Sequence, residues 1–298
     1  MKNSLGLILG LTAAVCWGLS DFVARFASRR IGAYRALLFM QLIGFAALTA
    51  YLVASGGFSR AATSNWHPWA LAFLAGSLNT IGSLALYFAF EFGVLTVVAP
   101  ISSSYPAITV VLALLSGEHI RALNAAGLFL TLVGLLLAAT SFSHAPGASA
   151  SSQPGISHSW FSKGVGWAIV SLISFGIMFW FLGFHVLPFL GAGLSVWVIR
   201  LATSSMLLLA AAPSRQSIRP PSGSVWWLLA IMGLMDTTAY TANNAGLQNG
   251  PVSIITVVAS LYGAVTVILS SIFLREHLKA TQWLGVALIF AGIVFVNL

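Results

Sequence analysis

The chain has 298 residues, of which 59% are hydrophobic and 6% are charged, and its mean hydropathy is +0.97. Soluble domains carry about a quarter charged residues, so this composition excludes an ordinary soluble protein and indicates a chain surrounded by lipid. The formal net charge of +8 does not indicate nucleic-acid binding, because the basic residues are scattered between apolar runs. A single cysteine, Cys16, excludes an internal disulfide.

Apolar runs long enough to cross a membrane follow one another along the whole chain, since a helical span needs about 20 mostly apolar residues. We predict ten spans, at residues 4–25, 35–54, 69–90, 95–116, 124–142, 164–187, 192–212, 225–247, 252–274 and 281–298. The first run continues past Cys16, which favours a retained span over a signal peptide or a lipoprotein box. The predicted fold class is therefore all-α, a polytopic membrane protein.

The two halves of the chain carry matched polar positions. Residues 79–119 align with residues 236–277 at a constant offset, with one residue added before Glu276 and His277. The aligned pairs include Asn79 with Asp236, Ser83 with Tyr240, Tyr87 with Asn244, Ser103 with Ser260, Tyr105 with Tyr262, and Glu118 with Glu276. We therefore predict two five-helix repeats, 1–142 and 163–298, joined by a linker at 143–162. Because five is odd, the second repeat should be inverted, as in many secondary transporters with a binding site between repeats.

The basic residues predict the orientation. Of the 13 Lys and Arg, 8 fall in the odd-numbered loops, 3 on the opposite side and 2 within spans. Since cytoplasmic loops carry an excess of Lys and Arg, the odd-numbered loops and the linker should be cytoplasmic. Both termini should then lie on the non-cytoplasmic side of a bacterial-type inner membrane.

Two polar stripes mark a candidate substrate cavity. Residues four apart share one face of a helix, and the third and eighth spans each carry such a stripe. The stripes comprise Asn79, Ser83, Tyr87 and Glu91, and Asp236, Tyr240, Asn244 and Gln248. Glu91 and Gln248 are expected at the membrane surface. Polar groups in lipid are costly unless they meet partners or water. The stripes either line a cavity or hold the bundle together through hydrogen bonds between helices.

The fourth and ninth spans offer a second pair of faces. Ser103 and Tyr105 lie between Pro100 and Pro106, and Tyr262 is equivalent to Tyr105. Prolines loosen a helix and free backbone carbonyls, so this segment could contact a ligand or bend. The alternative is close packing of helices through small residues.

Arg200 lies in the middle of a span, where a charge costs about +2.5 to +3.5 kcal/mol on the translocon scale. It needs an acid, carbonyls, water or a substrate anion. Two interpretations stay open: Arg200 binds the carboxylate of a substrate, or it pairs permanently with Asp236. Gln41 is its approximate equivalent in the first half, so the charge is present on one side only.

Aromatic residues are frequent within the spans, among them Trp17 and Trp180. Phe175 and Gly176 in the second half match Trp17 and Gly18 in the first. A cavity with aromatic walls and few fixed charges would suit a neutral or zwitterionic substrate with an apolar side group.

No motif indicates an enzyme. The histidines are dispersed, without a carboxylate cluster that would indicate a metal site. The sequence contains no P-loop and no HExxH motif, and no serine–histidine arrangement supports proteolysis. We therefore predict no catalytic residue, no metal and no cofactor.

Several motifs together resemble a known family. They are Trp17-Gly18-Leu19-Ser20-Asp21-Phe22, close to the family's W-G-S-N-F, the turns Gly117-Glu118 and Arg275-Glu276, and the helix glycines Gly127, Gly134, Gly285 and Gly292. Their order in both halves resembles the EamA-type ten-helix exporters of the drug/metabolite transporter superfamily, and especially the bacterial exporters of aromatic amino acids. The first-helix glutamate of the related four-helix multidrug exporters has no match here.

The resemblance implies eight helices around a central cavity, with the fifth and tenth helices peripheral, and export by alternating access. On that basis the candidate substrate-binding residues are Trp17, Asn79, Ser83, Tyr87, Ser103, Tyr105, Trp180, Arg200, Asp236, Tyr240, Asn244 and Tyr262. The expected function is export of aromatic or other neutral amino acids. Arg200 would attract the substrate carboxylate, and Asn79, Asn244 and Asp236 would bond its amino group.

The sequence leaves three rival functions. The first is efflux of drugs or quaternary cations such as methyl viologen, with Asp236 as the key charge. The others are a membrane-embedded enzyme and a scaffold or receptor that does not transport. The expected partners are a small-molecule substrate and the lipid bilayer, with no nucleic acid and no required oligomer.

Overall fold

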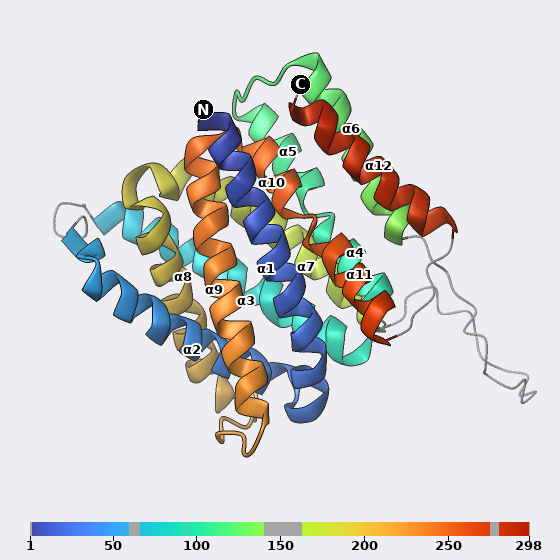
Figure 1. Cartoon of the computed structure of the whole chain (residues 1–298). Coiled ribbons are helices and arrows are strands. Elements are labelled where there is room, and N and C mark those ends of the chain that lie inside the picture. Colours follow the sequence, from blue (N-terminus) through green and yellow to red (C-terminus); the bar gives the residue numbers. More distant parts are fainter. Residues whose placement is uncertain (1, 60–65, 94, 140–162, 275–279, 298) are drawn as a thin grey trace, which may run out of the picture.

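The computed structural model describes residues 2–59, 66–93, 95–139, 163–274 and 280–297, and these residues form helices and turns with no strand among them. Figure 1 shows the arrangement of the helices. They are α1 (Lys2–Ile31), α2 (Ala33–Ala54), α3 (Trp66–Phe92), α4 (Leu95–Ser103), α5 (Pro106–Leu115), α6 (Ala122–Ala139), α7 (Lys163–Phe181), the π-helical turn η2 (Leu182–Val186), α8 (Leu187–Ala211), α9 (Val225–Asn249), α10 (Val252–Ala259), α11 (Tyr262–Leu274) and α12 (Ala280–Asn297).

Helices lie over every predicted span. Five described stretches are long and apolar enough to cross a membrane, namely Ser4–Ile31, Ala33–Ala54, Trp66–Phe92, Gly164–Ala211 and Val252–Phe273. The remaining spans are shorter or broken, or contain more polar residues, so the number ten stays a prediction. The linker 143–162 and the predicted turn Arg275-Glu276 lie outside the described residues.

Two equivalent helices are each broken at the same place. Pro106 begins α5, and its missing backbone N–H cannot continue the hydrogen bonds of α4. In the second half, α10 ends and α11 begins around Ser260, although no proline is present there. The Ser260 hydroxyl donates to the Val257 carbonyl at 2.7 Å, a local bond that competes with regular helix geometry. The prolines predicted the first break, and only the alignment of the two halves points to the second.

The equivalent helices α1 and α7 run in opposite directions. At the end of α1, the Arg29 guanidinium donates to the Gly93 carbonyl at 3.1 Å. A Cβ added to Gly164, at the start of α7, would lie 2.6 Å from the Cα of the same Gly93. The end of α1 and the start of α7 therefore lie at the same end of the bundle. In Figure 1, α6 and α12 lie side by side at one edge of the molecule, and they pack on each other.

Matched glycines let the two halves approach closely. A Cβ on Gly18 in α1 would lie 2.5 Å from the Val265 Cβ and 3.1 Å from the Tyr262 carbonyl oxygen. A Cβ on Gly176 in α7 would lie 2.7 Å from the Ile108 Cβ and 2.9 Å from the Tyr105 carbonyl oxygen. These neighbours are equivalent in the two halves. Each repeat therefore inserts its first helix against the broken helix of the other repeat.

We expect Gly18→Ala and Gly176→Ala to lower the free energy of unfolding by similar amounts, about 1–3 kcal/mol each, because each methyl group overpacks an equivalent contact. Gly166→Ala is the matched control, since Gly166 also lies in α7 and has nothing within 4 Å of its added Cβ. Unfolding of the purified chain in detergent measures the three values. Equal stability of Gly18→Ala and Gly166→Ala would contradict the close approach of α1 and α11.

Glu118 joins the two halves at the end of the bundle where α5 stops. Its carboxylate accepts hydrogen bonds from the backbone N–H of Val252 at 2.9 Å and of Ser253 at 3.1 Å, and from the Ser253 hydroxyl. These are the first residues of α10, whose N-terminus carries partial positive charge. Glu118, which belongs to one of the turns that carry the family resemblance, thus caps a helix of the other half.

Candidate functional site

A cavity lies where the two halves meet, with walls from α1, α2, α3, α7, α9 and α11 and from the α4–α5 break. Its lining residues are Trp17, Asp21, Met40, Ser83, Leu86, Tyr87, Tyr105, Phe175, Phe179, Asp236, Tyr240 and Tyr262. The volume that these side chains leave open to the centres of water molecules is only about 30 Å³. Since one water needs roughly 10–15 Å³ by that measure, the cavity in this conformation has room for about two waters.

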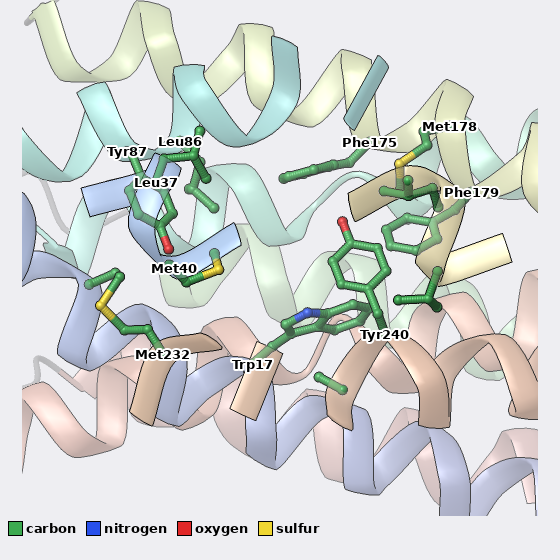
Figure 2. Close-up of a cluster of buried hydrophobic side chains, with 14 of the residues drawn as sticks. Trp17, Leu37, Met40, Leu86, Tyr87, Phe175, Met178, Phe179, Met232 and Tyr240 are labelled. Carbon is green, nitrogen blue, oxygen red and sulfur yellow. The ribbon is translucent and has the colours of Figure 1, made fainter. Parts of the chain in front are cut away.

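Trp17 is at the centre of the aromatic wall. Its ring centre lies 5.0 Å from that of Tyr240, 5.7 Å from Phe179 and 6.0 Å from Tyr262, each in an edge-to-face arrangement. Edge-to-face pairs at such distances are favourable beyond the area they bury. Figure 2 shows Trp17 and Tyr240 together, with Phe179 on the far side of Tyr240.

Tyr105, at the α4–α5 break, extends the aromatic wall. Its ring centre lies 4.9 Å from that of Phe179 and 6.3 Å from both Phe175 and Tyr262. The rings of Tyr105 and Tyr262 are stacked, with 19° between their planes. Because these two tyrosines are equivalent in the repeats, the broken helices present matched rings to one cavity.

Arg200 pairs with Asp236. Its Nη2 lies 2.5 Å from Asp236 Oδ2, and its Nη1 donates to Gln41 Oε1 at 2.5 Å. The second oxygen of Asp236 accepts the indole N–H of Trp17 at 3.0 Å. The guanidinium lies 5.7 Å from the ring centre of Tyr240 and is 1% exposed. Of the two interpretations left open by the sequence, the structure shows the ion pair, and Arg200 lies behind the cavity wall.

Gly44 in α2 makes room for this ion pair. A Cβ at Gly44 would lie 3.1 Å from the Arg200 Cζ and 2.4 Å from the Thr237 hydroxyl oxygen. Gln41 and Gly44 are one turn apart on the same helix face, and together they form the pocket that receives the guanidinium.

Asn79 and Asn244 also lie behind the wall. The Asn79 amide donates to the Thr203 hydroxyl at 3.0 Å, and its carbonyl accepts the hydroxyl of Tyr240. The Asn244 amide donates to the Ser195 hydroxyl at 3.1 Å. Both asparagines are fully buried. They connect α3 and α9 to α8, and Asn79 also holds the hydroxyl of the lining residue Tyr240.

Two further predicted residues lie elsewhere. Ser103 is buried where α4 meets α11, so close that a Cβ on Gly263 would lie 2.6 Å from the Ser103 Cβ. Trp180 donates its indole N–H to the Ser116 hydroxyl at 2.8 Å, away from the cavity lining. Trp180 follows the lining residue Phe179 directly, and consecutive helix positions point about 100° apart.

The cavity thus brings together seven of the twelve predicted residues: Trp17, Ser83, Tyr87, Tyr105, Asp236, Tyr240 and Tyr262. Asn79, Ser103, Trp180, Arg200 and Asn244 are not among its lining residues. Five lining residues were not predicted: Asp21, Met40, Leu86, Phe175 and Phe179. The sequence contained a signal for Phe175 and Phe179. Phe175 is equivalent to Trp17, and four residues further along each helix Phe179 is equivalent to Asp21.

Comparison with known proteins identifies the family. The model of the EamA-like transporter family matches residues 4–140 and again residues 162–298. The chain belongs to this family. This EamA-like protein is therefore a membrane transporter of small molecules, built from two repeats.

One solved structure, described as "Crystal structure of protein", is similar over 98% of this transporter and 97% of its own chain. The sequence identity is 18% and the TM-score is 0.73, so the likeness shows a shared fold alone. The curated proteins contain no match. Within the described part of this transporter, no three His, Cys, Asp or Glu side chains are grouped to hold a metal ion.

Proposed function

We propose that this transporter exports small metabolites that carry an amino group and an aromatic or other apolar side group, with aromatic and neutral amino acids as the first class to test. The aromatic cavity between the repeats carries this proposal. Seven aromatic side chains line it together with two carboxylates, Asp21 and Asp236. Apolar walls with a few placed polar groups are typical of sites that bind small molecules.

Transport would proceed by alternating access. The described conformation holds a cavity too small for an amino acid, so the helices must separate before a substrate can bind. The breaks at Tyr105 and Ser260 lie in equivalent helices, and a helix with an interrupted hydrogen-bond ladder can bend there. Two repeats rocking against each other around a site near the membrane midplane would open it to each side in turn.

The lining residues would contact the substrate, and the buried residues behind them would keep the lining residues in position. Trp17, Tyr105 and Phe179 would pack on the side group. Arg200, Asn79 and Asn244 would act as positioning residues, because their polar groups already bond Asp236, Thr203 and Ser195. A substrate carboxylate would meet hydroxyl groups such as that of Ser83 rather than the Arg200 guanidinium.

A second candidate substrate class is the organic cations. Its specific support is that the cavity lining includes two carboxylates and no Lys or Arg among the residues that the structure describes. Aromatic faces attract quaternary ammonium groups through cation–π interactions. Efflux of compounds such as methyl viologen would use the same cavity.

Flux into proteoliposomes tests the proposal. Vesicles that contain the purified chain should accumulate labelled phenylalanine above the level of empty vesicles, and unlabelled tryptophan should compete. Phe179→Ala should reduce this flux, whereas the control Gly166→Ala, whose added Cβ meets nothing within 4 Å, should not. Absence of flux for every amino acid tested would remove the amino-acid assignment, and flux of methyl viologen alone would establish the second candidate. The inner-membrane location and the non-cytoplasmic termini belong to the same proposal, since they rest on the Lys and Arg distribution.

A further inference from the structure

Asp21 is one of two carboxylates that line the cavity. It lies in α1, one turn after Trp17, and is 7% exposed. Within the residues that the structure describes, neither of its oxygens has a hydrogen bond or an ion pair. Asp236, the other acid of the cavity, has both oxygens occupied, one by Arg200 and one by the Trp17 indole N–H.

Neither acid of the cavity has an acidic equivalent in the other repeat. Equivalent positions in the repeats are Asp21 with Phe179 and Asp236 with Asn79. The half of the cavity wall formed by α7 therefore has phenylalanine where the half formed by α1 has a carboxylate. Since Arg200 balances the charge of Asp236, an ionised Asp21 leaves the cavity with one uncompensated negative charge.

None of the described residues that line the cavity with Asp21 is a Lys or an Arg. Tyr240 and Asp236 face the cavity from α9, Tyr262 from α11 and Tyr87 from α3. Arg200 in α8 is engaged behind Asp236, with its guanidinium buried. A buried carboxylate without a partner is costly, so a cationic group entering the cavity gains from meeting Asp21.

A hydroxyl and aromatic faces complete the surroundings. The Tyr262 hydroxyl is buried and has no hydrogen-bond partner in the described part of the chain, and its residue lines the same cavity. A primary ammonium has three N–H donors and is attracted to aromatic faces such as that of Trp17. A carboxylate, a free hydroxyl and aromatic rings are the groups that such a ligand requires.

We propose that Asp21 is the subsite that binds the ammonium group of the substrate, with the Tyr262 hydroxyl as a second acceptor and the aromatic rings around the apolar group. This inference rests on the proposed function and names the residue that selects an amine within it. The residues first expected to bond the amino group were Asn79, Asn244 and Asp236. Asn79 and Asn244 bond other residues behind the wall, and both oxygens of Asp236 are occupied.

Binding of two matched probes to the purified full chain in detergent tests the subsite. Phenethylamine and 2-phenylethanol differ only in an ammonium or a hydroxyl group, and titration calorimetry measures both affinities. The wild-type chain should prefer the amine by about 10- to 100-fold, the range expected for a charge-assisted hydrogen bond. Asp21→Asn should remove this preference by weakening amine binding, while affinity for the alcohol stays the same.

Two further variants separate the charge of Asp21 from effects on folding. Asp21→Glu keeps the carboxylate and should keep the preference for the amine. Glu91→Gln neutralises a carboxylate outside the cavity, where Glu91 accepts the Ala33 backbone N–H at 2.8 Å, and it should behave as the wild type. Thermal unfolding of each variant reports whether its fold is intact.

The outcomes distinguish the subsite from the proposed function. An unchanged amine preference in Asp21→Asn would overturn the subsite, and amino-acid flux into proteoliposomes would still support the function. No amine preference in the wild type would also overturn the subsite. Conversely, an Asp21-dependent preference without flux of amino acids or methyl viologen would support the subsite and refute the function.

Discussion

Arg200→Met should lower the free energy of unfolding by about 3–5 kcal/mol, because it leaves the carboxylate of Asp236 buried without its cation. The guanidinium is 1% exposed and lies 2.5 Å from Asp236 Oδ2, so water cannot replace it without repacking. Unfolding of the purified chain in detergent, monitored through the loss of its helical signal, measures the difference in free energy.

The double variant Arg200→Met with Asp236→Asn should recover most of that loss. It removes both charges together, and the asparagine oxygen can still accept the indole N–H of Trp17, which now bonds Asp236 at 3.0 Å. Arg35→Met is the matched control, since Arg35 bonds the Arg219 carbonyl at an exposed position and should cost only about 0.5–1.5 kcal/mol. A single Arg200→Met variant as stable as Arg35→Met would show that the ion pair does not hold the bundle.

Trp17→Ala should lower the free energy of unfolding by about 3–5 kcal/mol and abolish transport. The indole contacts three rings, those of Tyr240, Phe179 and Tyr262, and it satisfies one oxygen of Asp236. Its removal would leave a void at the point where the two repeats meet. Unfolding in detergent and flux into proteoliposomes measure the two effects.

Trp17→Phe separates packing from hydrogen bonding. It keeps a ring in the wall but leaves Asp236 Oδ1 without a donor, which should cost about 1–3 kcal/mol. Trp227→Ala is the control, since Trp227 is 76% exposed and should change stability little. If Trp17→Ala and Trp227→Ala had the same stability, the aromatic cluster would not support the fold.

The sequence by itself determined the class of the protein, its helices and its repeats. These depend on local properties, because an apolar run in lipid must satisfy its own backbone hydrogen bonds and therefore forms a helix. The constant offset between Asn79 and Asp236 revealed the duplication before any contact was known. The equal surroundings of Gly18 and Gly176 are the structural consequence of that duplication.

Only the tertiary structure decided which polar residue of each stripe reaches the cavity. Asn79 and Ser83 lie on one helix face, yet Asn79 meets Thr203 of α8 while Ser83 lines the cavity. Likewise Arg200 bonds Gln41 and Asp236 and does not face a ligand. Periodicity indicates the face of a helix, but the partner that satisfies a buried polar group comes from another helix, far away in the sequence. The rotation and depth at which helices pack therefore determined which carboxylate was neutralised and left Asp21 without a partner.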